Sequence, residues 1–200
     1  MRIAFSGVQC TGKTTLINAL KEDPLFEGFT VIKESIRSLK DKGYHINEEG
    51  NDDTQIAVMN AHIMNLIPNE TIIDRCAIDG LCYGQYSFNH NKISIDTLNF
   101  CRVVWELTRD YYDFIFYLRP EFDMVEDGTR STNKEFRDEV LKIFDSYIGE
   151  TYNRNVNHYG MYNNNIYMIS GTVEQRVQQV KQALMDKKLH LTGELVWKEK

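Results

Sequence analysis

Short runs of apolar residues alternate along this chain with longer segments of helical periodicity. Five runs rich in β-branched and aromatic residues predict strands at residues 2–6, 29–33, 70–74, 113–118 and 165–169. Several of these runs have apolar residues at consecutive positions, which is typical of strands that are covered on both faces. The strand pattern therefore predicts a sheet that lies between layers of helices.

The segments between these runs carry helical patterns and helix-start signals. Apolar residues recur at helical spacing at Ile56, Met59, Ile63, Leu66 and Ile67. Thr132 with Glu135, and Thr172 with Gln175, have the spacing of capping boxes ahead of two further helices. Strands that alternate with helices predict an α/β fold, a three-layer sandwich around a five-stranded and mostly parallel sheet. In such sheets ligands bind beyond the carboxyl ends of the strands.

Composition and charge indicate the number of domains and the classes of partner that this chain suits. The 200 residues include 23 Lys and Arg against 29 Asp and Glu, which gives a net charge of −6, and 42% are hydrophobic. These values suit one globular domain, and the acidic balance argues against broad binding to duplex nucleic acid. No apolar run approaches the roughly 18 residues of a membrane-spanning helix. We expect a cytoplasmic protein. The high content of Asn, Ile, Tyr and Lys with few prolines suggests an AT-rich genome, and if that genome is viral we expect the protein in the host cytoplasm.

Cysteine spacing and the ends of the patterned region add little chemistry. The four cysteines form no CxxC pair and have no His at zinc-site spacing, so we expect free, buried thiols. We expect one domain at residues 1–185 and a C-terminal extension at residues 186–200 that is either packed or a docking tail. The Asn-rich stretch 153–165 is typical of a surface loop.

A phosphate-binding motif follows the first predicted strand directly. Residues 7–14, GVQCTGKT, match GxxxxGK[ST] in every fixed position and open a helix. Backbone N–H groups of such a loop form an anion nest, Lys13 points toward the β- and γ-phosphates, and the Thr14 hydroxyl is a ligand for Mg²⁺. The residues expected to bind the nucleotide here are Gly7, Gln9, Cys10, Thr11, Gly12, Lys13, Thr14 and Thr15.

The ends of the second and third strands carry charged residues. Glu34 and Arg37 follow the second strand, where a carboxylate can take a proton from an attacking hydroxyl and an arginine can hold an anion. A surface ion pair is an equally good interpretation of this pair on position alone. Asp74 and Arg75 end the third strand, and an aspartate there suits the Walker B role of holding Mg²⁺.

The segments after the third, fourth and fifth strands complete the candidate site. Asp79 and Tyr83 follow Arg75 and are candidates for binding the acceptor, although aromatic rings here are more often core residues. Arg130 and Arg137 follow the fourth strand, where they are either lid arginines that neutralise a transferring phosphoryl group or solvated charges. Gly171 lies in the turn after the fifth strand, where backbone groups can contact adenine.

Taken together, these residues resemble the P-loop kinase-like family that includes the nicotinamide-riboside kinase domain of NadR-type proteins. They are similar, more distantly, to deoxynucleoside and thymidylate kinases. The matching segments GVQCTGKTT, KESIR, DRCAIDGLCYG, LRPEFDMVEDGTRSTNKEFR and ISGTVEQR occur in family order over most of residues 1–180. The first is general to NTPases, and the others are individually weak and jointly specific. The resemblance implies a nucleoside/nucleotide-kinase-like fold with a lid segment.

The resemblance also implies roles for single residues. Lys13 and Thr14 would bind the phosphates of ATP and Mg²⁺. Glu34 would be the catalytic base or a ligand of the substrate hydroxyl, with Arg37 close to the substrate. The pair Asp74–Arg75 looks like the acidic-Arg pair of the third strand. Arg130 and Arg137 look like lid arginines, which completes the expected catalytic set with Lys13, Glu34 and Arg75.

The leading hypothesis is a Mg²⁺-ATP-dependent kinase that transfers the γ-phosphate to a nucleoside- or nucleotide-like acceptor, with Glu34 as the base. Two alternatives stay open, a kinase that acts on a hydroxyl of a modified base in DNA and an NTP-dependent switch. The GTPase motif NKxD is incomplete, because residues 133–136 read NKEF. We expect a small-molecule partner and no membrane, with nucleic acid less favoured, and the sequence leaves a homodimer open.

Overall fold

Five parallel strands form one sheet in the computed structural model, which describes residues 1–34, 36–121, 133–157 and 165–192. The strands are β1 (Arg2–Ser6), β2 (Thr30–Ile32), β3 (Thr71–Asp74), β4 (Phe114–Leu118) and β5 (Ile166–Ile169). Their order in the sheet is β2-β3-β1-β4-β5, and every pairing is parallel. Each strand lies within a run that predicted it, so the predicted five-stranded α/β fold is confirmed.

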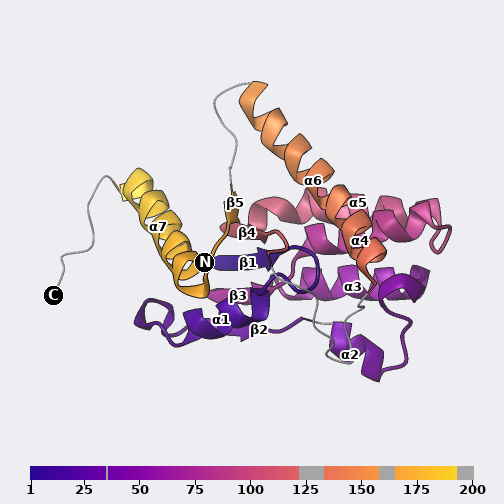
Figure 1. Cartoon of the computed structure of the whole chain (residues 1–200), viewed down its shortest axis with the longest axis horizontal. Coiled ribbons are helices and arrows are strands. Elements are labelled where there is room, and N and C mark those ends of the chain that lie inside the picture. Colours follow the sequence, from indigo (N-terminus) through magenta and orange to yellow (C-terminus); the bar gives the residue numbers. More distant parts are fainter. Residues whose placement is uncertain (35, 122–132, 158–164, 193–200) are drawn as a thin grey trace.

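Helices cover both faces of this sheet, as Figure 1 shows. α1 (Lys13–Lys21) and α7 (Val173–Thr192) lie on one face. On the other face lie α3 (Asp52–Met64), α4 (Ala77–Asn89), α5 (Ile95–Thr108) and α6 (Lys134–Asn157). The short α2 (Ile36–Asp41) follows β2. Sequence periodicity predicted α1, α3, α6 and α7 but not α2, α4 and α5. The segment of α4 contains two glycines and few strong helix formers, which weakens its local signal for a helix.

Alternate residues of each strand pack into the two cores. Ile3 and Phe5 of β1 contact the core under α1 and α7, whereas Ala4 between them contacts the core under α3 to α6. In β4, Phe114 and Phe116 face the first core and Ile115 faces the second. Two apolar faces explain why the strands read as continuous apolar runs rather than as alternating ones.

Capping residues set where the last two long helices begin. The Thr172 backbone N–H donates to Gln175 Oε1 at 2.8 Å, and the Gln175 N–H donates to Thr172 Oγ1 at 3.3 Å. This reciprocal pair is the predicted capping box ahead of α7. Ahead of α6, Asn133 Oδ1 accepts from the Phe136 N–H at 3.1 Å. The box expected between Thr132 and Glu135 includes Thr132, which lies outside the described residues.

Three segments differ in detail from the sequence prediction. Of the apolar residues that predicted α3, Met59 and Leu66 are buried, but Ile56, Ile63 and Ile67 are exposed. The stretch expected to be a loop from residue 153 is helical up to Asn157, because α6 continues that far. α7 passes without a break through the boundary expected after residue 185, and Lys187 Nζ donates to the Asp113 carbonyl at 2.7 Å.

Three of the four cysteines are buried, as the sequence predicted, and Cys10 is not. None of the four cysteines, which all lie in the described residues, forms a disulfide; Cys76, Cys82 and Cys101 are buried and Cys10 is partly exposed. No helix among the described residues is both long and apolar enough to cross a bilayer.

Two glycines let α4 approach α3 closely, and one of them gives a test of this packing. A Cβ on Gly80 would lie 2.3 Å from Met59 Sδ and 3.4 Å from Val58 Cγ1. Met59 is fully buried and has no room to withdraw. We expect Gly80→Ala to lower the free energy of unfolding by about 1–3 kcal/mol through overpacking, measured by urea denaturation.

Gly149 provides the matched control, because it lies in α6 and a Cβ there meets nothing within 4 Å. Gly149→Ala removes only the excess backbone freedom of glycine and should stabilise by about 0.5–1 kcal/mol. Equal effects of the two substitutions would contradict the close α3–α4 contact.

Candidate active site

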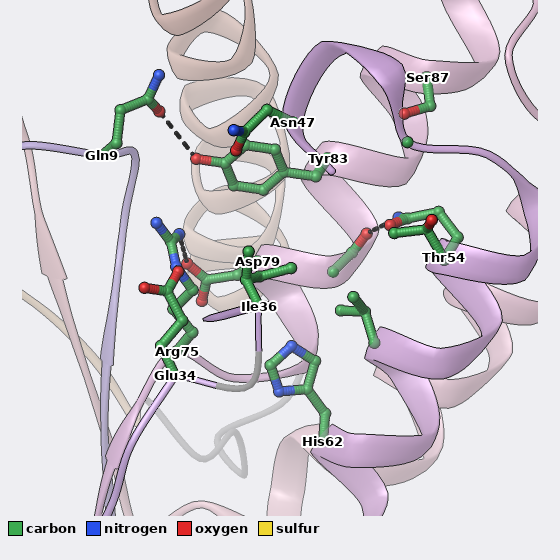
Figure 2. Close-up of a pocket in the computed structure, with 14 residues that line it drawn as sticks. Gln9, Glu34, Ile36, Asn47, Thr54, His62, Arg75, Asp79, Tyr83 and Ser87 are labelled. Carbon is green, nitrogen blue, oxygen red and sulfur yellow. Dashed lines mark hydrogen bonds and ion pairs between the residues drawn. The ribbon is translucent and has the colours of Figure 1, made fainter. Parts of the chain in front are cut away.

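The candidate site lies at the carboxyl ends of β1, β2 and β3, where the phosphate-binding loop borders a pocket. Figure 2 shows this pocket between the loop, the end of β2 and the helices α3 and α4. The described residues that line it are Gln9, Glu34, Ile36, Asn47, Gly50, Thr54, Gln55, Val58, His62, Arg75, Asp79, Gly80, Tyr83 and Ser87. The pocket therefore adjoins the loop at the edge of the sheet where ligands bind in parallel α/β folds.

The backbone of the loop between β1 and α1 requires its glycines. Gly7 has φ 134°, and a Cβ there would lie 2.3 Å from the Leu118 carbonyl oxygen. Gly12 has φ 82° at the N-cap of α1, and Cys10 has φ 58°. These left-handed residues turn the chain so that it enters α1 with its helix N-terminus at the loop, as an anion-binding nest requires.

Lys13 is buried inside this loop. Its Nζ donates to the carbonyl oxygens of Gly7 at 2.8 Å and Val8 at 2.6 Å, and to Thr11 Oγ1 at 3.1 Å. Burial, together with the positive charge of Arg75, lowers the pKa of Lys13 from its usual 10.5 to about 7. Its ammonium group is therefore held among neutral oxygens and would gain from an added negative charge.

Thr14 and Asp74 meet at the mouth of the loop. Thr14 Oγ1 donates to Asp74 Oδ2 at 3.0 Å, and Asp74 Oδ1 is buried with no hydrogen-bond partner in the described part of the chain. Burial, with a smaller contribution from Glu34, raises the pKa of Asp74 above its usual 3.8. A hydroxyl and a carboxylate oxygen are hard ligands of the kind that Mg²⁺ takes, so these residues fit this cation.

The described residues contain no group of three or more His, Cys, Asp or Glu side chains that could hold a metal ion. A Mg²⁺ that is shared between one or two protein oxygens and nucleotide phosphates needs no such cluster. Thr14 and Asp74 are thus the described residues that would hold it.

Arg75 connects the loop, β2 and α4. Its Nη1 donates to the Gly7 carbonyl at 2.9 Å and to Asp79 Oδ1 at 3.0 Å, and its Nε donates to Glu34 Oε1. The residue has φ 75°, a left-handed conformation that costs a non-glycine residue on the order of 1–3 kcal/mol. This backbone turn at the end of β3 places the guanidinium group between its three partners.

Asp79 serves this network and the start of α4 together. Its Oδ1 accepts from the Gly7 N–H at 3.2 Å, and its Oδ2 accepts from the Cys76 N–H at 3.0 Å in a capping box. The carboxylate lines the pocket, but its two oxygens already have partners in the loop, in Arg75 and in the helix start. The position of Asp79 is that of a residue which fixes the site.

Tyr83 is the one predicted aromatic candidate that lines the pocket in the described residues. Its hydroxyl donates to Gln9 Oε1 at 3.0 Å, and the Arg75 guanidinium lies 5.3 Å from its ring centroid (Figure 2). Burial raises the pKa of Tyr83 to about 12, so its hydroxyl keeps its proton. Tyr86 packs on Phe136 in the core, which is the ordinary role expected for such rings.

The remaining predicted residues are more scattered. Thr15 and Arg37 are exposed, and Arg37 is not among the described residues that line the pocket. Arg137 is mostly buried on α6, where its Nε lies 3.6 Å from Asp138 Oδ1. Gly171, with φ 95°, donates its N–H to Glu121 Oε2 at 2.8 Å. Arg130 lies outside the described residues.

Several residues reach the site without having been predicted there, among them two with ionisable side chains, His62 and Arg176. His62 of α3 is buried and lines the pocket. Arg176 of α7 is buried, its Nη1 donates to the Thr11 carbonyl at 2.6 Å, and its Nη2 lies 3.4 Å from Glu121 Oε1. Arg176 belongs to the segment ISGTVEQR that carries the family resemblance, so its sequence position was a usable signal. His62 offered none, because it is one polar residue inside an amphipathic helix.

Solved structures share this fold at low sequence identity. Deoxyadenosine kinase from M. mycoides with dCMP and dCDP bound matches with a TM-score of 0.64 at 16% identity, over 92% of this chain and 98% of that chain. NadR in complex with NR matches with a TM-score of 0.65 at 15% identity, over 99% of this chain and 53% of that chain. YorR from Bacillus subtilis, in complex with phosphorylated GDP, gives 0.55 at 13% identity, over 96% and 98%.

These neighbours confirm the predicted nucleoside-kinase-like fold and the resemblance to the group that includes NadR. No curated protein gives a significant match to the sequence. A family model described as AAA domain matches residues 2–176, which is most of the chain and includes the loop, Glu34, Asp74 and Arg75. The chain therefore belongs to the AAA_28 family of AAA domains.

Proposed function

We propose that the protein is a Mg²⁺-ATP-dependent phosphotransferase that moves the γ-phosphoryl group of ATP to a nucleoside- or nucleotide-like acceptor. The observation that carries this proposal is the position of Glu34. Its carboxylate lines the acceptor pocket and is tied through Arg75 to the Gly7 carbonyl of the phosphate-binding loop. A carboxylate at the junction of a phosphate site and a neighbouring pocket suits proton removal from an attacking hydroxyl.

The loop residues hold the donor in this proposal. Lys13 neutralises charge on the β- and γ-phosphates, and the N–H groups of the loop and of the α1 N-terminus orient them. Thr14 and Asp74 would hold Mg²⁺ through their hydroxyl and carboxylate oxygens. When bound, Mg²⁺ supplies neutralisation of the charge on the transferring group.

Glu34 and Arg75 act on the acceptor side. Glu34 takes the proton of the acceptor hydroxyl. The oxygen of that hydroxyl forms the new bond to the γ-phosphorus, while the bond between the γ-phosphorus and the β-γ bridging oxygen breaks and leaves ADP. Arg75 orients the Glu34 carboxylate. From the family resemblance we also assign charge neutralisation in a lid to Arg130 and Arg137, and a substrate contact to Arg37.

Two further proposals concern the residues that form the phosphotransferase unit and those that contact the adenine of the donor. We assign the phosphotransferase unit to residues 1–185 and treat residues 186–200 as an extension, although α7 crosses that boundary. Gly171 and the turn around it would contact the adenine of the donor, because this turn ends β5 on the loop side of the sheet.

Replacing Glu34 tests the base directly. We expect Glu34→Gln to reduce phosphoryl transfer by about 10²–10⁴-fold, because an amide cannot accept the proton. ATP affinity should change little, since Lys13, Thr14 and the loop backbone are intact. Transfer of labelled phosphate to a panel of nucleosides and nucleotides measures the first quantity, and titration with a fluorescent ATP analogue measures the second.

Glu27→Gln is the matched control for this variant, because Glu27 is exposed and lies away from the pocket lining. A Glu34→Gln protein that transfers phosphate at the wild-type rate would refute the assigned base. If the wild type hydrolyses ATP but phosphorylates no acceptor, an NTP-dependent switch would be favoured instead.

Asp74 tests the metal. Asp74→Asn keeps an oxygen that can accept from Thr14 but removes the negative charge, so the Mg²⁺ concentration for half-maximal transfer should rise by about tenfold or more. Asp96→Asn, at an exposed residue in the first turn of α5, should leave it unchanged. A Mg²⁺ dependence that is identical in Asp74→Asn and the wild type would exclude Asp74 as a ligand.

The low pKa of Lys13 predicts a pH dependence of nucleotide binding. The free protein loses the Lys13 proton above about pH 7, whereas bound phosphates favour the protonated form, so binding above pH 7 takes up a proton. The dissociation constant for ATP should therefore rise by up to about tenfold per pH unit above pH 7. Calorimetry in buffers of different ionisation enthalpy measures the proton uptake.

Lys13→Arg is the control for this effect, because the guanidinium group stays charged over the whole range. This variant should bind ATP more weakly but with a flat pH profile. A flat profile in the wild type would show that Lys13 is protonated throughout.

A further inference from the structure

His62 lies deep in the acceptor pocket and has no role in the chemistry described above. It is 3% exposed, and it lines the pocket together with Glu34, Arg75 and Asp79 (Figure 2). It comes from α3, the helix that also supplies Thr54 and Gln55 to the same lining. Buried polar side chains normally have a hydrogen-bond partner, so one without a partner beside a pocket requires a physical explanation.

Packing fixes the orientation of its ring. The Cδ2 edge faces Gly80 of α4, because a Cβ on that glycine would lie 3.3 Å from His62 Cδ2. In Figure 2 the imidazole extends from α3 toward the part of the pocket where Asp79 and Ile36 lie, and Nε2, unlike Nδ1, is not among the buried atoms without a hydrogen-bond partner. Nδ1 is buried and has no hydrogen-bond partner in the described part of the chain.

The charge and the tautomer of the ring follow from this environment. Burial, and to a smaller extent the charge of Arg75, lowers the pKa of His62 to about 4, so the ring is neutral at physiological pH. A neutral imidazole carries one N–H and one lone pair. A buried N–H without an acceptor is rarer than a buried unsatisfied lone pair, so the proton belongs on Nε2 and the lone pair on Nδ1. The pocket is thus presented with an N–H donor.

Three donors of the lining near His62 are already used within the protein, whereas Gln9 Nε2 is buried without a hydrogen-bond partner in the described part of the chain. Thr54 Oγ1 donates to the His45 carbonyl at 2.6 Å, Gln55 Nε2 donates to the Gly80 carbonyl at 2.7 Å, and the Tyr83 hydroxyl donates to Gln9. The carboxylates of Glu34 and Asp79 are acceptors and disfavour an anionic group nearby. The chemistry at His62 therefore suits an uncharged acceptor atom of a ligand.

We propose that His62 is a specificity-determining residue whose Nε2–H donates to a carbonyl oxygen or unprotonated nitrogen of the acceptor's heterocyclic ring. This inference rests on the proposed function for the nature of the acceptor. It identifies the heterocyclic ring as the part of the acceptor that His62 recognises. A ring that places such an atom against His62 gains a hydrogen bond, whereas a ring that lacks it leaves a buried N–H unpaired.

Direct binding of nucleosides tests the proposal without relying on turnover. Calorimetry would compare two pairs that differ in one ring carbonyl, inosine with purine riboside and uridine with 2-pyrimidinone riboside. In at least one pair the wild type should bind the carbonyl-bearing member about tenfold more tightly. His62→Phe should abolish that preference and leave the affinity for the other member within about twofold.

Two further variants separate recognition from folding. His62→Gln keeps an N–H donor at a similar reach and should restore part of the preference. His45→Gln, at an exposed histidine outside the pocket lining, should bind all four nucleosides as the wild type does. A preference that persists in His62→Phe, no preference in the wild type, or no binding of any of the four would overturn the proposal.

Assays of phosphoryl transfer to the same nucleosides keep this inference distinct from the proposed function. A His62-dependent binding preference without transfer would support the inference and refute the phosphotransferase activity. Transfer with no dependence of nucleoside affinity on His62 would refute the inference and support the activity.

Discussion

The buried guanidinium group of Arg75 is the interaction on which this site depends. It bridges the phosphate-binding loop at the Gly7 carbonyl, the end of β2 at Glu34 and the start of α4 at Asp79. A buried charge is tolerated only with good partners, and the loss of one partner of a buried pair commonly costs about 3–5 kcal/mol. The three elements are therefore held in one arrangement, and the left-handed backbone of Arg75 is a strain that this arrangement supports.

The same network divides the carboxylates of the site by their partners. The Asp74 carboxylate accepts from the Thr14 hydroxyl and lies near Lys13, whereas the Glu34 carboxylate accepts from Arg75 at the edge of the pocket. Asp79 has both oxygens in hydrogen bonds to the protein. The three carboxylates thus differ in their partners: a hydroxyl for Asp74, a guanidinium group for Glu34, and backbone N–H groups together with Arg75 for Asp79.

Local sequence was sufficient for the parts of the fold that local physics decides. The strands, the glycine-dependent loop and the Thr172 capping box depend on residues close in the chain, and all were predicted. Local sequence could not decide whether Asp79 binds the acceptor or fixes the site, because its partner Gly7 lies 72 residues away in the chain. α4 was missed because its two glycines weaken the local signal for a helix, and α5 was missed as well. His62 was missed because only its packing against Gly80 separates it from an ordinary helical histidine.

Helix packing and chemistry meet at Gly80. The absence of a side chain there lets α3 approach α4 closely enough that Met59 and the edge of His62 fill the space. The approach brings the imidazole into the lining of the pocket beside Val58, whereas Met59 stays in the apolar cluster. A larger residue at that position would force the two helices apart and withdraw the only ring nitrogen of α3 that the described structure directs into the pocket. The glycine is thus a requirement of the pocket lining as much as of the helix pair.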